Sequence, residues 1–313
     1  MVMTYLLFVV GIFLLVKSAG WIVDSSSSIA KRLGVSSLVI GLTVVAFGTS
    51  LPELVVNLFA AGAGSGSISF GNIVGSNIAN ILLVLGITAI IGNIKIKSDT
   101  VWKEIPFALL AGFVLFALTW EKEFFTRNDG LVLLSLFVLF LYYIFMSTRK
   151  DKEKIGFVEN VDGVGLRIGL KLVLGFVGIY FGGRFVVDGA IAIAGTLGLS
   201  EYLISATIIA VGTSLPELVV GIMAVLRKDV DLAVGNIVGS NIFNVFGVFG
   251  IIPFIGPIGI PSFVGFDIAI MFLTTLLLFV FMFLGKKGEL SKTEGIVFVM
   301  FYILYIWFII IRG

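Results

Sequence analysis

The chain carries two glutamates inside long apolar runs, and each of them follows a proline in the same nine-letter stretch. "GTSLPELVV" at 48–56 recurs letter for letter at 212–220, which places Glu53 and Glu217 at equivalent positions of the two copies. Proline lacks an amide hydrogen and clashes with the carbonyl four residues back, so each copy frees backbone carbonyls next to a carboxylate. In a membrane a freed carbonyl must find a partner or line a polar cavity. The duplicated pair therefore predicts an ion-binding site rather than two ordinary helix kinks.

Further oxygen-bearing side chains accompany each glutamate. A threonine and a serine precede it by four and three residues, so they share its helix face. A second motif, "GNIVGSNI" at 71–78 and 235–242, starts a polar stripe in which every fourth residue is polar. Carboxylate, hydroxyl, amide and carbonyl oxygens suit hard cations such as Ca²⁺ and Na⁺, and suit soft transition metals poorly. The side chains concerned are Thr49, Ser50, Asn72, Ser76 and Asn80 in the first copy, and Thr213, Ser214, Asn236, Ser240 and Asn244 in the second.

The composition indicates what kind of scaffold must hold these groups. Of the 313 residues 59% are hydrophobic and 13% are charged, with a mean hydropathy of +1.17. Apolar runs of about 18 residues or more, separated by short charged stretches, are typical of membrane-spanning helices. With no Cys and no His, the sequence excludes thiolate or imidazole metal sites, disulfides and His-based catalysis. We predict an all-α polytopic membrane protein without a resident cofactor, and no nucleic-acid or obligate protein partner.

The hydropathy pattern predicts ten spans. They cover 4–29, 36–62, 67–92, 103–119, 130–147, 165–194, 200–226, 231–255, 263–285 and 292–311. The prolines interrupt the second and the seventh of them.

The basic residues predict the orientation of these spans, because Lys and Arg concentrate in cytoplasmic loops. With both termini outside the cell, the outer loops and ends receive only Lys122, Arg127 and Arg312. The inner loops receive Lys31, Arg32, Lys95, Lys97, Lys103, Arg149, Lys150, Lys152, Lys154, Arg227, Lys228, Lys286, Lys287 and Lys292. We therefore expect a multi-pass protein of the cell membrane with extracellular termini.

The chain consists of two halves that repeat the same motifs. The offset that relates Glu53 to Glu217 also relates the two copies of the second motif, and Asp24 to Asp188. It predicts a first five-helix repeat over 1–149, a basic cytoplasmic linker over 150–163, and a second repeat over 164–313. Because five is an odd number of spans, the second repeat enters the membrane upside down. Inverted repeats with interrupted helices are typical of secondary transporters, whose substrate site lies near the bilayer midplane.

On these motifs, the sequence resembles the calcium/cation antiporter superfamily, and its compact ten-span form resembles the prokaryotic sodium/calcium exchanger branch. The resemblance implies that Glu53 and Glu217 bind both Ca²⁺ and Na⁺, with backbone carbonyls of Thr49 and Thr213 completing the Ca²⁺ site. It implies two outlying Na⁺ sites and a central pair of amides. One Na⁺ site would be lined by Ala46, Ser50 and Ser76, the other by Ala210, Ser214 and Ser240, and the central pair would be Asn80 and Asn244. Some relatives carry aspartate at the position of Asn244, so this chain has two carboxylates there and not three.

The resulting functional hypothesis is a secondary antiporter that exchanges Na⁺ for Ca²⁺ by alternating access. The resemblance implies three Na⁺ per Ca²⁺, and hence electrogenic exchange. The alternative is a H⁺/Ca²⁺ antiporter of the same superfamily, in which the glutamates are protonated; the additional hydroxyl and carbonyl oxygens favour Na⁺. A channel is disfavoured by the inverted repeats and the closed two-carboxylate site, and the sequence contains no catalytic constellation of an enzyme.

Some conspicuous residues are interpreted as structural. We expect Asn72 and Asn236 to cap or tie helices, and Asp24 and Asp188 to act near the ends of long tilted spans. We also expect the first and sixth spans to slide against a core made of spans 2, 3, 7 and 8.

Overall fold

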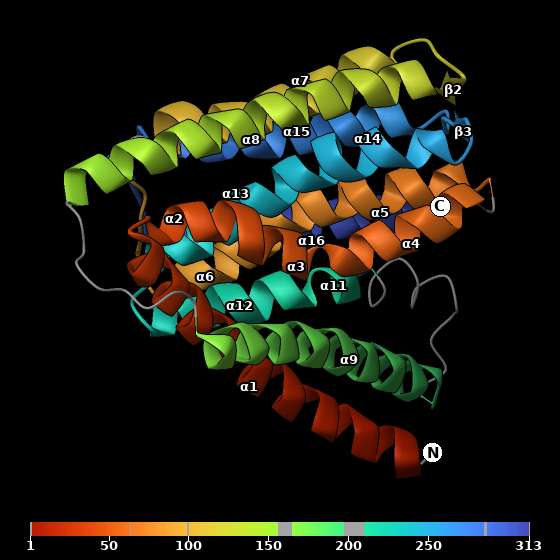
Figure 1. The fold of residues 1–313 in the computed structure, drawn as a ribbon. Coiled ribbons are helices and arrows are strands. Elements are labelled where there is room, and N and C mark those ends of the chain that lie inside the picture. Colours follow the sequence, from red (N-terminus) through yellow and green to blue (C-terminus); the bar gives the residue numbers. More distant parts are fainter. Residues whose placement is uncertain are drawn as a thin grey trace.

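The computed structural model describes residues 2–62, 64–98, 100–155, 165–196, 210–284 and 287–312, which form a bundle of helices with four two-residue strands (Figure 1). Among these residues, eight helices are long and apolar enough to cross a membrane, or nine if a helix pair bent by 46° counts as one span. The prediction of an all-α polytopic membrane protein is confirmed. The predicted span 200–226 and the predicted linker 150–163 lie partly outside the described residues.

The helices follow the predicted spans closely. The first half contains α1 (Val2–Leu33), α2 (Ser37–Ile40), η1 (Gly41–Val45), α3 (Ala46–Thr49), α4 (Leu51–Gly62), α5 (Gly66–Ala79), η2 (Asn80–Leu85), α6 (Gly86–Ile91), η3 (Thr100–Glu104), α7 (Ile105–Thr119) and α8 (Arg127–Ile155). The second contains α9 (Leu166–Thr196), α11 (Ala210–Thr213), α12 (Leu215–Leu226), α13 (Val230–Ile242), η5 (Phe243–Val248), α14 (Phe249–Ile251), η6 (Ile252–Phe254), α15 (Val264–Phe281) and α16 (Lys292–Arg312).

Helix ends reflect local sequence. Helix α1 ends at Leu33 because Gly34 adopts a φ of +63°, a left-handed conformation that favours glycine. Helix α8 continues to Ile155, beyond the predicted end at residue 147. The extension contains lysines and a glutamate, which are good helix formers, and neither proline nor glycine occurs before Gly156.

Two helical rods cross the centre of the molecule, α5–η2–α6 and α13–η5–α14. Their most apolar windows are 78% and 89% buried, against 22–39% for the other single spans. Helix α13 lies against α2 and η1 with almost no side chain between the backbones: a Cβ added at Gly235 would meet the carbonyl oxygen of Leu38 at 2.6 Å. At Gly239 it would meet the Cα of Leu42 at 2.7 Å. The first-half counterparts Gly71 and Gly75 differ, because nothing described lies within 4 Å of a Cβ added at either position.

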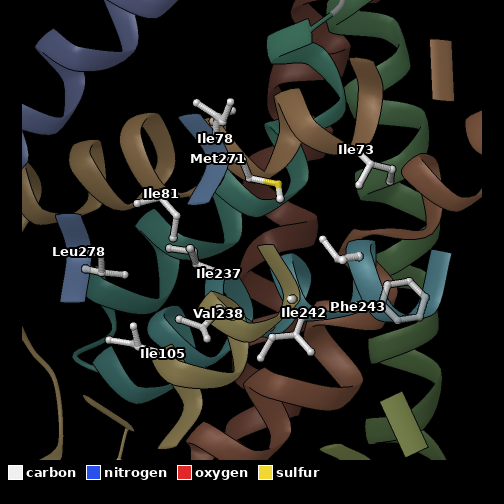
Figure 2. Close-up of a cluster of buried hydrophobic side chains, with 14 of the residues drawn as sticks. Ile73, Ile78, Ile81, Ile105, Ile237, Val238, Ile242, Phe243, Met271 and Leu278 are labelled. Carbon is white, nitrogen blue, oxygen red and sulfur yellow. The ribbon is translucent and has the colours of Figure 1, made fainter. Parts of the chain in front are cut away.

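The large hydrophobic core surrounds these central rods. Figure 2 shows side chains that come from helices far apart in the chain, among them Ile78, Ile237 and Met271. Helices α7, α8 and α15 lie along one side of this core (Figure 1), and α16 packs against α6 and η2. The core therefore joins both halves of the chain into one packed body.

Helices α1 and α9 form a separate layer on the opposite side (Figure 1). They approach closely where glycines replace side chains, since a Cβ at Gly182 would lie 2.9 Å from the backbone nitrogen of Leu15. A second, smaller hydrophobic cluster joins this pair to α12 and to the helices around it; it includes Ile22, Val220 and Ala224. The pair thus has its own packing, distinct from the large core.

The four short strands connect the two halves at both ends of the bundle. Strand β1 (Ile94–Lys95) pairs antiparallel with β4 (Glu289–Leu290), and β2 (Phe124–Phe125) pairs antiparallel with β3 (Ile258–Gly259). The offset between the two repeats relates β1 to β3. Each small sheet therefore contains one strand from each half of the chain.

Candidate ion-binding site

Both glutamates lie just after a helix interruption. Helix α3 ends at Thr49 and α4 begins at Leu51, while α11 ends at Thr213 and α12 begins at Leu215. The residue between them has nearly the same backbone in both copies, with φ −88° and ψ 9° at Ser50 and φ −88° and ψ 3° at Ser214. Each glutamate consequently lies in the first turn of a helix, where the helix dipole favours a negative charge.

Glu217 is fully buried and accepts hydrogen bonds from serines of two other helices. Ser50 donates to its Oε1 at 3.1 Å and Ser240 donates to the same oxygen at 3.3 Å. The Ser240 hydroxyl also lies 3.5 Å from the carbonyl oxygen of Ala46. One oxygen of this carboxylate is thus held by hydroxyl groups of the first and second halves together.

Glu53, also fully buried, has a similar arrangement. Ser76 lies 3.4 Å from its Oε1 and 3.2 Å from the hydroxyl of Thr213. Ser50, in the turn before Glu53, contacts Glu217, and Ser76 joins Glu53 to Thr213, in the turn before Glu217. The structure therefore brings together Glu53, Glu217 and the hydroxyls of both repeats.

Two of the amides tie helices together, as expected. Asn236 accepts a hydrogen bond at 3.0 Å from the hydroxyl of Thr49, which joins α13 to α3. Asn72 accepts one at 2.8 Å from Asn57, whose amide nitrogen also donates to the carbonyl oxygen of Glu53. The counterpart of Asn57 in the second half is Gly221, so the two halves tie these helices differently.

A ring of four amides at the crossing of the central rods includes two residues that sequence analysis missed. Asn77 and Asn241 each donate to the other's backbone carbonyl at 3.1 Å. Their side-chain oxygens accept hydrogen bonds at 3.0 Å from Asn244 and Asn80, respectively. Both occupy the seventh position of the repeated "GNIVGSNI", and this repetition was the available signal.

The ring determines which atoms Asn80 and Asn244 present. The NH₂ groups of Asn80 and Asn244 donate to the ring, which leaves their side-chain oxygens free to accept. Neither Asn80 Oδ1 nor Asn244 Oδ1 has a partner among the described residues. The same is true of Oε2 in Glu53 and in Glu217. A buried acceptor without a donor is costly. These four oxygens, two from each half, are unpaired acceptors of the kind that hard cations bind.

The other predicted residues lie around this set. Ser214 is buried and its hydroxyl has no partner among the described residues. The expected grouping of Ala46 and Ser50 with Ser76 differs from the observed contacts. Ser50 contacts Glu217, and the carbonyl oxygen of Ala46 lies near Ser240. Ala210 begins α11, and its side chain lies outside the described part of the structure.

A fold of long apolar helices around a buried polar centre defines a multi-pass membrane protein. The family model described as "Sodium/calcium exchanger protein" matches residues 3–146 and 169–311, and the chain belongs to that family. It is 30% identical over 341 residues to sodium/calcium exchanger MaX1 of Methanosarcina acetivorans, covering 96% of this chain and 97% of that one. It is 36% identical to inner membrane protein YrbG of Escherichia coli, over 78% and 77% of the two chains.

Solved structures agree with this assignment. The sodium-calcium exchanger NCX_Mj, soaked with Na⁺ in the absence of Ca²⁺, superimposes with a TM-score of 0.81 and 34% identity, covering 98% of this chain and 99% of that one. Further structures of the same exchanger, soaked with Na⁺ and Sr²⁺, match equally well.

Proposed function

We propose that this protein exchanges Na⁺ for Ca²⁺ across the cell membrane by alternating access, and that both ions bind at the acceptor set of Glu53, Glu217, Asn80 and Asn244. The carrying observation is that these buried residues hold four oxygens without a hydrogen-bond donor among the described residues. Carboxylate and amide oxygens are the ligands that Ca²⁺ prefers. Family membership and the Na⁺, Ca²⁺ and Sr²⁺ soaks of NCX_Mj support the same ions.

Charge explains how loading would be coupled to movement. One Ca²⁺ or two Na⁺ neutralise Glu53 and Glu217, whereas a site without ions holds two repelling carboxylates inside the membrane. A single charged side chain at the centre of a bilayer already costs about 2.5–3.5 kcal/mol on insertion scales. The ion-free protein should therefore change its conformation only rarely, which prevents a leak.

The hydroxyl groups favour Na⁺ over H⁺ as the coupling ion. Ser50 and Ser240 contact Glu217, and Ala46 O lies near Ser240. Ser76 contacts both Glu53 and Thr213. We propose these two groups, together with Thr49, Ala210 and Ser214, as the surroundings of the Na⁺ ions. Bound Na⁺ can use these hydroxyl and carbonyl oxygens as ligands, whereas a proton on a glutamate needs none of them.

We further propose ten spans in two inverted repeats, 1–149 and 164–313, with the second and seventh spans interrupted at Pro52 and Pro216. The mixed pairing of strands supports this arrangement, because β1 with β4 and β3 with β2 are the same pairing after exchange of the halves. Both termini lie at one end of the bundle, opposite the end where α8 stops and α9 begins (Figure 1). The basic residues would place the termini outside the cell.

Uptake of ⁴⁵Ca²⁺ into proteoliposomes tests the function. Liposomes are preloaded with Na⁺, with K⁺ or at acidic pH, and are diluted into a medium that lacks the preloaded ion or has a higher pH. We expect uptake to require internal Na⁺ alone. Uptake driven by the proton gradient and indifferent to Na⁺ would instead establish H⁺/Ca²⁺ exchange.

The charge balance gives a second readout of the same assay. Three Na⁺ per Ca²⁺ moves one net positive charge per cycle, and neutral Asn at both 80 and 244 supplies no compensating charge. Uptake should therefore respond to a membrane potential clamped with valinomycin. A final Ca²⁺ ratio that is independent of the imposed voltage would mean two Na⁺ per Ca²⁺.

A further inference from the structure

Polar contacts between the α1–α9 pair and the rest of the protein are concentrated at one end of the bundle. Asp24 of α1 binds Lys171 of α9 at 3.1 Å, and it also forms an ion pair with Arg227 at the C-terminal end of α12. Three residues further along α1, the Ser27 hydroxyl donates to Asp229 at 2.5 Å. Asp229 also accepts from the amide of Leu232 and caps the N-terminus of α13. Helix α1 is thus attached to the α12–α13 turn by two contacts.

The opposite end lacks these contacts among the described residues. Asp188, the repeat counterpart of Asp24, forms an ion pair within its own helix, with Arg184 at 3.7 Å. No other partner of Asp188 occurs in the part of the chain that the structure describes. Both side chains are well exposed, and they line a cavity of about 290 Å³ together with Leu7, Phe181 and Phe185.

The difference between the polar contacts at the two ends follows from the sequence, so it does not depend on the conformation of the protein. At the equivalent positions of the other repeat, Leu7 replaces Lys171, Ala63 replaces Arg227, and Ser65 replaces Asp229. The residue equivalent to Ser27 is Ile191. In a conformation with the roles of the two repeats exchanged, Asp188 would face Ala63 and not an arginine. The Asp24–Arg227 attachment can therefore form at one end only.

We infer that Asp24 and Arg227 are positioning residues that set the sidedness of exchange: their ion pair stabilises the conformation closed at the end with the basic loops. This inference rests on the proposed alternating access, in which the α1–α9 pair moves against the core. Lys171 moves together with Asp24, because α1 and α9 form one packed pair. Arg227 belongs to the core, so this ion pair must break when the basic end opens, and the counterpart of Arg227 for the other end is the uncharged Ala63.

The size of the effect follows from exposure. The Arg227 side chain is 50% exposed and that of Asp24 is 35% exposed, so the pair is partly screened by water. Such pairs shift an equilibrium by about two- to five-fold. When the population competent to bind from one side rises, the apparent dissociation constant on that side falls by the same factor. Asp24→Asn and Arg227→Gln should each lower the half-saturating Ca²⁺ concentration at the basic end by about two- to five-fold and raise it at the opposite end.

Two single-cysteine reporters measure the conformation independently of transport, since the natural chain contains no cysteine. Met223 of α12 lies against Gly20 of α1, and Val187 of α9 lies against Gly212 of α11. In the Asp24→Asn and Arg227→Gln backgrounds, a membrane-impermeant maleimide should label Met223→Cys faster from the basic end. It should label Val187→Cys more slowly from the other end.

The matched control is Asp188→Asn, which removes the counterpart carboxylate and should leave both labelling rates and both half-saturating concentrations unchanged. The double variant Asp24→Asn/Arg227→Gln should shift no further than either single variant, because both remove the same contact. Opposite shifts at the two ends support the inference. Equal weakening at both ends, no shift, or the same shift in Asp188→Asn overturns it.

The proposed function can fail separately. If the unaltered protein shows no Na⁺-driven ⁴⁵Ca²⁺ uptake, the proposed exchange is wrong, yet the labelling rates still test the positioning role. If one variant does not fold, the other decides, since Asp24 and Arg227 lie on different helices and contribute the same ion pair.

Discussion

The central rods and the α1–α9 pair differ in what they bury and in how they are held. The rods α5–η2–α6 and α13–η5–α14 are almost enclosed and cross through a ring of hydrogen-bonded amides. The α1–α9 pair is mostly exposed, and it is joined to the core by a small hydrophobic cluster and by the contacts of Asp24 and Ser27 with the α12–α13 turn. The comparison agrees with the proposed function, in which a fixed centre presents ion ligands and a peripheral pair moves against it.

The largest expected effect comes from breaking the centre. Glu53→Gln or Glu217→Gln removes half of the negative charge of the acceptor set without changing its shape. Mutation of residues that merely support a metal ligand costs about 10–100-fold, so loss of a ligand should reduce Na⁺-driven ⁴⁵Ca²⁺ uptake by more than about 100-fold. The matched control is Glu104→Gln, a buried glutamate outside the site that is hydrogen-bonded to Tyr143. Near-normal uptake by either site variant would rule out the assignment.

Cross-linking distinguishes the moving pair from the core. Leu15 and Gly183 face each other within the α1–α9 pair, and Gly20 faces Met223 across its boundary with α12. With cysteines at either couple and a short bifunctional thiol reagent, we expect exchange to persist after the first cross-link and to fall to background after the second. Exchange that survives the Gly20–Met223 cross-link would contradict movement at this boundary.

The amide ring sharpens the description of the centre. Asn77→Ala or Asn241→Ala removes the acceptor that holds Asn244 or Asn80, so that amide loses its fixed orientation. We expect a rise of about 10–100-fold in the half-saturating Ca²⁺ concentration, with a smaller change in maximal rate. Asn93→Ala, at an exposed amide that donates to Glu289, serves as the control. An unchanged Ca²⁺ requirement would show that the ring only packs the rods.

The smallest effect concerns stability of the fixed centre. Gly235→Ala forces a methyl group against the backbone of α2, and overpacking of this kind costs about 1–3 kcal/mol. Gly265→Ala is a suitable control, because nothing described lies within 4 Å of its added Cβ. Thermal unfolding in detergent, followed by tryptophan fluorescence, should show a lower midpoint for the first variant only. Equal midpoints would mean that the crossing is more adaptable than the contacts indicate.

Much of this organisation could be predicted from sequence, because it depends on properties of short segments. Apolar length predicted most span boundaries to within a few residues, and the exact repeat identified Glu53 and Glu217 as a buried pair. The π-helical turns η2 and η5 at the two asparagines could not be predicted, since they depend on how the rods cross. The same holds for the crossed grouping of Ser50 and Ser240 around Glu217, which needs contacts between the halves.

The role of the ends was also beyond sequence reasoning. Asp24 and Asp188 are equivalent by the repeat, and both were interpreted as structural. Their difference depends on Lys171 and Arg227, which lie at distant positions and become neighbours only in the fold.

The position of a bound ion tests the central claim most directly. Crystals of the protein equilibrated with Sr²⁺ or Ca²⁺ would be measured for anomalous scattering, with Glu53→Gln treated in parallel. We expect a peak in the unaltered protein in direct contact with Glu53 Oε2 and Glu217 Oε2, at about 2.3–2.6 Å, which disappears in the variant and is displaced by Na⁺. A peak elsewhere in the bundle, or a peak that survives in Glu53→Gln, would contradict the proposed site.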